Sequence, residues 1–368
     1  MKTSGWISLV GLVALLAASG CDDGGSEQTV VGNGNGGDTT GLSLVLPTAN
    51  EALFSDGGRA FYMHTNRTFE GRRSQPWQAG QYGYVRNPVR TDAGKIVYTR
   101  RHEGLDIRPK RRDADGLAAD TVRAIDEGRV VYANTVANNS NYGKYAVVRH
   151  KWGGSPYFSL YAHLAEIAVP ESTRVAQGEP LGRVGHTGHG LNTERAHVHL
   201  EIALLLNRRF QRWFEDYYPP DANKNGLFSG LNLAGLNPAA LYQALRTNEV
   251  DSVETFIQNR KPFYRALLPG PAPPNLTRRY PWLLPENAPQ EASSWTVTLT
   301  ETHLPLRVTP SDSTVPRPVA TWARSVPHRL TYRALGYLTR DDGRVMLTRR
   351  GLKYARLLAQ RDGSQGLS

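Results

Sequence analysis

The chain has 368 residues, of which 39% are hydrophobic and 21% are charged, so it can bury a sizeable core and is not a disordered polar chain. It carries 36 glycines and 23 prolines and shows no heptad or solenoid repeat, which argues against coiled coils and repeat arrays and favours short strands joined by turns. The formal net charge of +11 suits anionic partners of several kinds, including nucleic acid and lipid head groups, and does not select one.

The first residues predict export. Met1 and Lys2 give a short positive start, an apolar run follows over residues 6–18, and small residues precede Cys21. The run is shorter than the about 20 residues that a membrane-spanning helix needs, so it indicates a secretion signal that is removed. The segment resembles a bacterial lipoprotein signal, in which Cys21 is lipidated and becomes the new N-terminus. An ordinary signal with an incidental cysteine is the alternative.

Cys21 is also the only cysteine in the chain. The mature protein therefore has no disulfide, and any metal site in it must use histidine and carboxylate ligands. Residues 22–41 are rich in glycine and polar residues and predict a flexible tether with a reach of roughly 25 Å. For an exported protein, the anionic partners at hand are the cell wall and lipid head groups, so no nucleic-acid partner is expected.

Short alternating apolar segments separated by glycines predict antiparallel strands between residues 96 and 206. Helices are expected over residues 238–246 and 253–258, and strands followed by a helix near the C-terminus. The predicted fold class is mainly β, a β-rich α+β fold whose antiparallel sheet is followed by a smaller β/α module. The predicted divisions are the signal with its lipobox cysteine (1–21), the tether (22–41), an N-terminal extension packed on the central region (42–95), the central β region (96–206), a mostly helical and loop extension (207–266), a proline-rich linker (267–290) and a C-terminal module of unknown role (291–368).

Histidines and one aspartate gather in three short segments of the central β region. These are His-Glu-Gly-Leu-Asp at 102–106, Tyr-Ala-His-Leu at 161–164 and Ala-His-Val-His-Leu-Glu at 196–201. Side chains two residues apart on a strand share a face, so His197 and His199 project together while the apolar residues between and after them face the core. Both imidazoles could contact a common atom, but they need not both bind a metal.

His102 and Asp106 would lie ~13 Å apart on a fully extended strand, too far to share an ion at donor distances of ~2 Å. The chain must therefore bend between them, and Gly104 is where a bend costs least. Two imidazoles and one carboxylate would leave a fourth tetrahedral position for water, as in a catalytic rather than a structural zinc site.

The segment around His163 alternates between apolar and polar residues. Phe158, Leu160 and Ala162 alternate with Ser159, Tyr161 and His163. The alternation predicts that His163 faces out of its sheet, where its imidazole could bond an attacking water or a developing oxyanion.

The three motifs, in this order, resemble the lysostaphin-type (LytM-like) zinc endopeptidases, as does the segment Val-Ala-Gln-Gly-Glu-Pro-Leu-Gly-Arg-Val-Gly-His-Thr-Gly at 175–188. The resemblance covers roughly residues 96–206 and implies a mostly antiparallel sheet with its site in a narrow groove. It implies that His102, Asp106 and His199 bind one zinc ion. It also implies that His163 and His197 assist catalysis by orienting the attacking water and stabilising the tetrahedral intermediate.

Some residues depart from the common form of that family. The loop before the last motif carries His186 and His189, and Glu194-Arg195-Ala196 stands where the family frequently has a Gly-Pro or Ala-Pro pair. These departures concern the shape of the groove and its substrate preference rather than the metal site. The residues predicted to line the substrate groove are Tyr161, His186, His189 and Glu194.

The resulting expectation is a zinc endopeptidase that hydrolyses peptide bonds in peptidoglycan cross-links or stems, exported and anchored to a membrane as a lipoprotein facing the periplasm or cell wall. Its expected partners are peptidoglycan and, through the lipid, the membrane. The alternative from another class is a non-catalytic peptidoglycan-binding regulator of a cell-wall amidase on the same scaffold. Such proteins usually lack one or more metal-site residues, and here none is missing. An enzyme that cuts other extracellular peptides is a third possibility.

Overall fold

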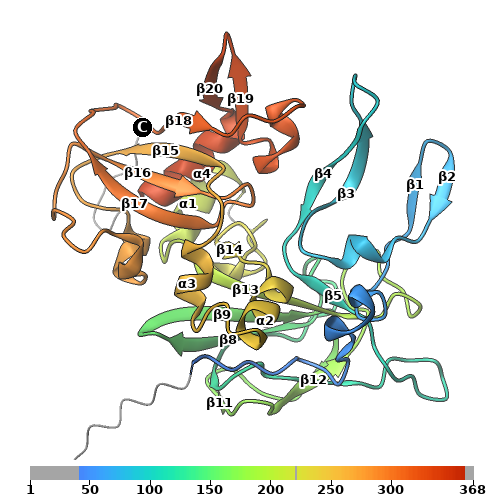
Figure 1. The fold of residues 1–368 in the computed structure, drawn as a ribbon. Helices are drawn as coiled ribbons and strands as arrows, with labels where there is room; N and C mark the ends of the chain where they lie inside the picture. Colours follow the sequence, from blue (N-terminus) through green and yellow to red (C-terminus); the bar gives the residue numbers. More distant parts are fainter. Residues whose placement is uncertain (1–40, 220–221, 361–368) are drawn as a thin grey trace, which may run out of the picture. The chain divides into compact units, whose positions relative to one another are not determined.

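A computed structural model of the protein describes residues 41–219 and 222–360. The predicted signal, Cys21 and nearly all of the predicted tether lie outside these residues. Within them, no helix combines the length and the apolar character that crossing a membrane requires. The described residues form one compact unit (Figure 1).

A seven-stranded antiparallel sheet carries the three motifs. Its order is β11-β7-β8-β9-β13-β14, and β5 pairs with β13 on the edge opposite β9, next to β14. The expected mainly β fold is thus confirmed. The strands are β5 (Leu105–Ile107), β7 (Gly128–Asn134), β8 (Tyr145–Trp152), β9 (Ser155–Ala162), β11 (Arg174–Val175), β13 (Val198–Leu205) and β14 (Leu233–Gly235).

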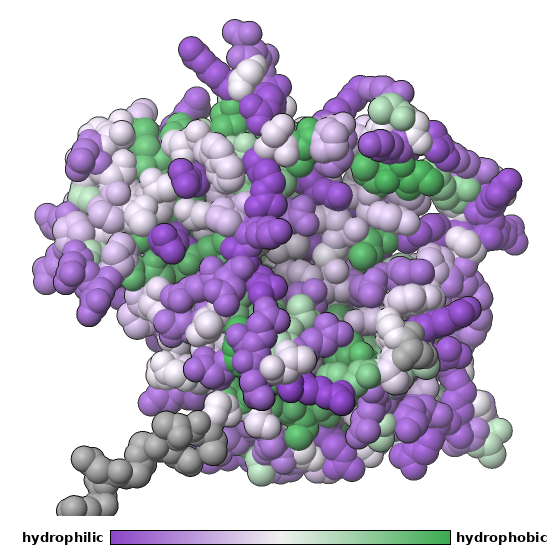
Figure 2. Space-filling model, viewed as in Figure 1, coloured by the Kyte–Doolittle hydropathy of each residue, from purple (hydrophilic) through white to green (hydrophobic). Residues whose placement is uncertain are grey.

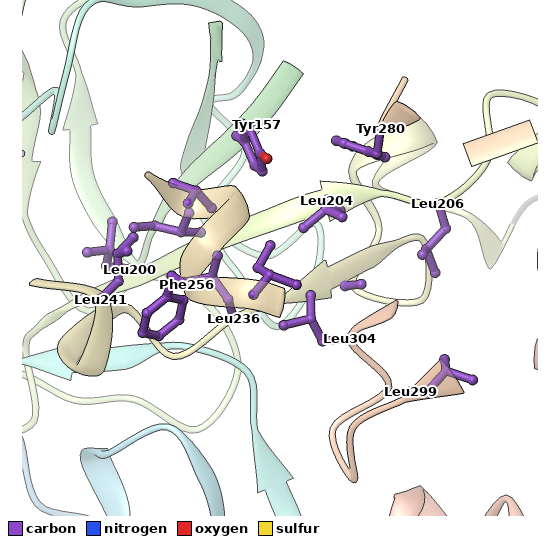
Figure 3. Packing of buried hydrophobic residues seen from close by; sticks show 14 of the residues in the cluster. Tyr157, Leu200, Leu204, Leu206, Leu236, Leu241, Phe256, Tyr280, Leu299 and Leu304 are labelled. Carbon is purple, nitrogen blue, oxygen red and sulfur yellow. The ribbon is translucent and has the colours of Figure 1, made fainter. Parts of the chain in front are cut away.

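Strand β13 is buried along its whole length because other strands flank it and both of its faces are covered. Leu200 and Leu204 belong to the main apolar cluster, where Figure 3 shows them with Leu236 and Phe256. The opposite face of the sheet packs a smaller cluster that includes Ala203. Since side chains alternate along a strand, His199 shares this second face, and the fold sets the histidines apart from the main core.

Smaller sheets and hairpins surround this sheet. Strand β4 ends at His102, so the hairpin β3–β4 delivers the first histidine of the site. Arg67 of the neighbouring hairpin donates hydrogen bonds to Val85 and Tyr98, which holds the two hairpins side by side (Figure 1). These strands are β1 (Arg67–Phe69), β2 (Arg72–Ser74), β3 (Gly83–Arg90), β4 (Ile96–His102), β6 (Thr121–Arg123), β10 (Leu164–Ile167) and β12 (Pro180–Val184).

Helices α2 (Pro238–Arg246) and α3 (Val253–Gln258) lie where the sequence predicts them. Asn237 and Ser252 cap their first turns with side-chain hydrogen bonds. The remaining α-helices are α1 (Phe210–Tyr217) and α4 (Arg349–Ala359). Short 3-10 helices lie at Ala52–Phe54, Asp56–Gly58, Trp77–Gly80, Gly226–Phe228, Asn275–Arg278, Pro281–Leu283, Leu330–Tyr332 and Ala334–Gly336.

The C-terminal region contributes a four-stranded sheet of order β17-β16-β15-β18 and the hairpin β19–β20. Strand β15 crosses the predicted boundary between residues 266 and 267 and pairs with β16, so the predicted linker begins inside this sheet. Figure 2 shows hydrophilic residues at the tip of β19–β20. The strands are β15 (Tyr264–Pro269), β16 (Ser294–Leu299), β17 (Pro305–Ser311), β18 (Val319–Ala323), β19 (Leu338–Asp341) and β20 (Arg344–Leu347).

One apolar core joins the C-terminal region to the central sheet. Leu299 and Leu304 belong to the same cluster as Leu200 and Leu204 (Figure 3). The Tyr280 hydroxyl accepts a hydrogen bond of 2.9 Å from the main-chain N–H of Leu205. The two regions are therefore expected to unfold together.

Candidate metal centre and groove

His102, Asp106 and His199 lie together at the end of the central sheet. Asp106 on β5 stands opposite His199 on β13 in the strand register. Asp106 Oδ1 is 3.0 Å from His102 Nε2 and 3.0 Å from His199 Nδ1, and the two nitrogens are 3.1 Å apart. All three residues are buried, and their candidate donor atoms lie within 4.8 Å of one another.

The expected bend between His102 and Asp106 occurs at residues 103–104. Gly104 is needed there because the chain passes very close to its neighbour. A Cβ atom on Gly104 would lie 2.1 Å from the main-chain oxygen of Leu200. Only a residue without a side chain lets β5 approach β13 so closely, and this approach brings Asp106 next to His199.

The three donors fit a zinc ion. Ligand atoms at ~2.1 Å from a tetrahedral ion are about 3.4 Å apart, close to the spacing seen here. The other polar atom of each side chain already has a partner. His102 Nδ1 donates to the Gln81 carbonyl at 2.8 Å, and Asp106 Oδ2 accepts from Arg86 at 2.5 Å. These contacts fix each ring or carboxylate so that its remaining atom faces the common centre.

Glu201 orients His199 from the same strand face. His199 Nε2 is 3.0 Å from Glu201 Oε1, which also accepts a 2.7 Å hydrogen bond from the Tyr142 hydroxyl. Burial alone would lower the pKa of His199, but its bonds to Asp106 and Glu201 raise that pKa to about 9. The metal-free cluster therefore holds a proton that a bound cation would displace.

Asp106 is ionised in this setting. Burial would raise its pKa, but His102, His197 and Arg86 together lower the pKa well below its usual value. A charged carboxylate is the form that a divalent cation requires as a ligand.

His163 and His197 lie beside the three donors. His197 Nδ1 donates to the Arg195 carbonyl at 2.7 Å, and its Nε2 is 3.2 Å from Asp106 Oδ1. His163 Nδ1 donates to the Thr187 carbonyl at 2.9 Å, and its ring centre is 4.8 Å from that of His197. Burial and the neighbouring His197 and His199 lower the pKa of His163 well below its usual value, so its ring is neutral.

His163 reaches the site by a route that differs from the predicted alternation. Phe158 and Ala162 lie in the cluster on the face shared with His199, whereas Tyr161 lies in the main core. Regular alternation would send His163 to the main core as well. Its backbone instead adopts a left-handed φ of 63° just after β9 ends, which turns the ring back to the site.

Tyr161 does not line the groove, contrary to the prediction. It is fully buried, and its hydroxyl accepts a 2.9 Å hydrogen bond from the main-chain N–H of Ile125. The alternation in the sequence placed Tyr161 and His163 on the same face of the strand. The left-handed backbone at His163 instead turns its ring away from that face.

Comparison with known proteins finds one family whose sequence profile covers the three motifs. The sequence profile of peptidase family M23 matches residues 100–210, an interval that contains all three motifs. Residues 100–210 are thus similar to the domain of peptidase family M23, and we call them the M23 domain. The resemblance to lysostaphin-type peptidases that the three motifs predict is thereby confirmed.

Two curated relatives of the chain are lipoproteins. The outer membrane antigenic lipoprotein B of Haemophilus influenzae is 24% identical over 181 residues, which are 48% of this chain and 39% of that protein. The protein of the same name from Histophilus somni is 31% identical over 104 residues, 28% of each chain. The chain thus spans less than half the length of these relatives.

Solved structures with a similar segment include two peptidases. The catalytic domain of the antimicrobial peptidase lysostaphin from Staphylococcus simulans has 19% identity and a TM-score of 0.28, with 45% of this chain and 96% of that chain covered. A zinc containing peptidase from Vibrio cholerae has 24% identity and a TM-score of 0.25, with 39% of this chain and 36% of that chain covered.

A groove of about 1060 Å³ opens beside the three donors of the M23 domain. His163, His197 and His189 line it, and His189 Nδ1 is 3.0 Å from the Asn141 side-chain oxygen. His186 and Glu194 are not among its described lining residues, contrary to the prediction; Glu194 is largely exposed and 3.7 Å from His64. The described basic residues of the lining are Arg67, Arg86, Arg100, Arg101, Arg195, Lys224 and Arg350, and the described acidic ones are Glu103 and Asp106.

Proposed function

We propose that the M23 domain is an active zinc endopeptidase that hydrolyses peptide bonds in the cross-links or stems of peptidoglycan. One observation carries the proposal: His102, Asp106 and His199 converge to within 4.8 Å with no member of the set missing. A non-catalytic regulator of a wall amidase would have no need for this complete and internally braced donor set.

His102, Asp106 and His199 would hold the ion. When bound, zinc acts as a Lewis acid that activates a water molecule and polarises a carbonyl group. His163 and His197 each donate Nδ1–H to a main-chain carbonyl, which leaves Nε2 of each ring for the reaction, and Nε2 of His197 lies 3.2 Å from Asp106 Oδ1. One of these nitrogens takes the proton of the attacking water and passes it to the leaving amine. The other, when it carries a proton taken from solvent, donates a hydrogen bond to the oxygen on which negative charge develops.

We also propose that the protein is an exported lipoprotein, anchored to a membrane through Cys21. The apolar run over residues 6–18 and the relatives named as outer membrane lipoproteins support this location. The anchor would keep the enzyme near the wall polymer. Fractionation of cells that express Cys21→Ala tests the anchor, since the variant should leave the membrane fraction and an unchanged distribution would contradict the proposal.

Mass analysis of fragments released from purified peptidoglycan tests the enzymatic activity. The zinc-loaded full chain should release peptides with new amino and carboxyl ends, and Asp106→Ala and His199→Ala should release none. Arg149→Gln, an exposed change on β8, serves as a matched control that should behave like the wild type. Full activity in either donor variant would overturn the assignment. No release with or without zinc would favour the regulator.

A further inference from the structure

Arg195 comes directly before the last motif in the sequence and has no role in the proposed reaction. Its carbonyl accepts the 2.7 Å hydrogen bond from His197 Nδ1, and its side chain lines the same groove as His197. Burial lowers the pKa of Arg195, and the charge of Asp106 partly offsets this. Arg195 is therefore fixed beside the reacting groups.

The loop that carries Arg195 is braced on two sides. The main-chain N–H of Arg195 donates to the carbonyl and the side-chain oxygen of Asn192, both at 3.1 Å. Arg112 donates to the carbonyls of Thr193 and Glu194 at 2.9 and 3.0 Å. Such a loop presents its side chain in a defined place, which lowers the entropy cost of binding a ligand there.

The guanidinium of Arg195 lacks an acidic partner among the described residues. Its Nε donates to the His64 carbonyl at 3.3 Å, and the adjacent Glu194 is 3.7 Å from His64 instead. No described carboxylate oxygen lies within the 4.0 Å that defines an ion pair with it. A half-buried guanidinium with free N–H groups matches the planar geometry of a carboxylate.

The charges around Arg195 favour an anionic ligand. Of the two described acidic residues in the lining, Asp106 is bonded to Arg86, and Glu103 lies 3.8 Å from Arg101. The described basic residues outnumber them, so the groove carries a surplus of positive charge. A charged ligand entering such a cleft is attracted before any direct contact forms.

We propose that Arg195 binds a free carboxylate of the substrate, so that the groove selects peptides with a carboxylate next to the scissile bond. This specificity rests on the proposed peptidase function and deepens it. The carboxylate could belong to a side chain or to a chain end, and both present the same pair of oxygens to the guanidinium.

Two peptides that are identical except for one group test the proposal. On the residue next to the scissile bond, one peptide carries a carboxylate and the other a carboxamide. The value of kcat/KM is measured for each peptide with the zinc-loaded full chain. The wild type should prefer the carboxylate by about tenfold or more, mainly through KM, as expected for loss of one charge-assisted contact. In Arg195→Gln the preference should fall close to one, Arg195→Lys should keep part of it, and Arg149→Gln should keep the wild-type ratio.

Fluorescence anisotropy measures binding of the same peptides to the zinc-free chain. This measurement separates the carboxylate site from the peptidase function. If no peptide is cleaved but the Arg195-dependent binding preference persists, the peptidase function fails and the carboxylate site stands. If cleavage occurs without any preference, the site is refuted and the peptidase function stands. An equal loss of kcat for both peptides in Arg195→Gln, with unchanged zinc content, would place Arg195 at the reacting carbonyl and also overturn the proposal.

Discussion

His163 and His197 differ from the metal donor His199 in what their Nδ1 atoms do, since Nδ1 of His199 faces Asp106. In each of the two rings Nδ1 donates to a main-chain carbonyl, of Thr187 or Arg195, so the ring is fixed by the backbone. His102 is held in a similar way through Gln81, but its free nitrogen points at Asp106 and His199. The proposed function therefore assigns proton transfer and metal binding to different residues that lie close together.

Replacing His197 by alanine should separate metal binding from turnover. We expect His197→Ala to keep its zinc and to lose kcat by about 10²–10⁴-fold, because a group that transfers a proton is removed while the three donors remain. Zinc content and peptide release are measured on the same preparation. His328→Ala, a change at a half-buried histidine that is not among the described lining residues of the groove, is the control. Loss of zinc in His197→Ala would instead make His197 a ligand, as its 3.2 Å distance to Asp106 allows.

At the level of single residues, spacing and facing predicted that the motif histidines and Asp106 could meet. Glu201 was also within reach of the same reasoning, because it lies two residues after His199 on one strand face. No local sequence pattern indicated that Arg86 would bind Asp106 or that the Gln81 carbonyl would bind His102. These contacts depend on how a separate hairpin packs against the site. The left-handed conformation of His163 was equally hidden, because nothing in Ala-His-Leu marks it.

Strands β5 and β13 depend on Gly104 for their close approach. In Gly104→Ala the new Cβ would meet the Leu200 oxygen at 2.1 Å, so one strand must shift and move His102 relative to Asp106. We expect a loss of about 1–3 kcal/mol in the free energy of unfolding, the range for overpacking, together with weaker zinc binding. Urea unfolding and zinc titration measure both.

Gly41→Ala is the matched control for this change. A Cβ there meets its nearest neighbour at 3.4 Å, an ordinary contact, and its backbone is not left-handed. Its stability should stay within about 0.5 kcal/mol of the wild type. Equal stability and equal zinc affinity in Gly104→Ala and the wild type would contradict the role assigned to this glycine.

At the level of elements, the sequence predicted antiparallel strands between residues 96 and 206, the two helices α2 and α3, and the bend before β5, but it missed β15. These follow from local periodicity, capping and glycine placement. It placed the wrong face of β9 at the site, because it took the polar face for the exposed one, whereas both faces of that strand are buried.

Across the whole molecule, the C-terminal region supports the hairpin that ends in His102. Arg101 donates to the Thr302 carbonyl, and the Tyr82 hydroxyl is 2.9 Å from the Thr302 hydroxyl. The Tyr84 hydroxyl accepts a 2.6 Å hydrogen bond from the main-chain N–H of Leu335. Partners more than 200 residues apart in sequence leave no pattern in a single chain, so the sequence left this region without a role.

His303 should make the folded protein sensitive to acid. Burial, with Arg101 and Arg350, lowers its pKa well below the usual value, and the ring stacks 4.2 Å from Tyr337. The unfolded chain binds a proton near pH 6.5 that the folded chain excludes. The contribution of His303 to the free energy of unfolding is therefore fully present above about pH 6.5. It falls as the pH drops, by up to about 1.4 kcal/mol per pH unit for this one group.

In His303→Asn the free energy of unfolding should depend on pH less steeply, by up to about 1.4 kcal/mol per pH unit, because asparagine does not titrate. Asparagine also tolerates the left-handed φ of 69° at this position. Urea unfolding at pH 7.5, 6.5 and 5.5 with a chelator present measures the slope. The change His328→Asn, at a half-buried histidine, should leave the slope as in the wild type. Parallel pH profiles for His303→Asn and the wild type would refute this role.

The account depends most on one ion held by two imidazoles and one carboxylate. Elemental analysis of the purified 368-residue chain after zinc loading and dialysis tests this directly. We predict about one zinc per chain in the wild type and in His328→Ala, and little or none in Asp106→Ala, because two histidines alone leave an incomplete ligand set. Zinc bound as tightly by Asp106→Ala as by the wild type would contradict the metal site and the chemistry built on it.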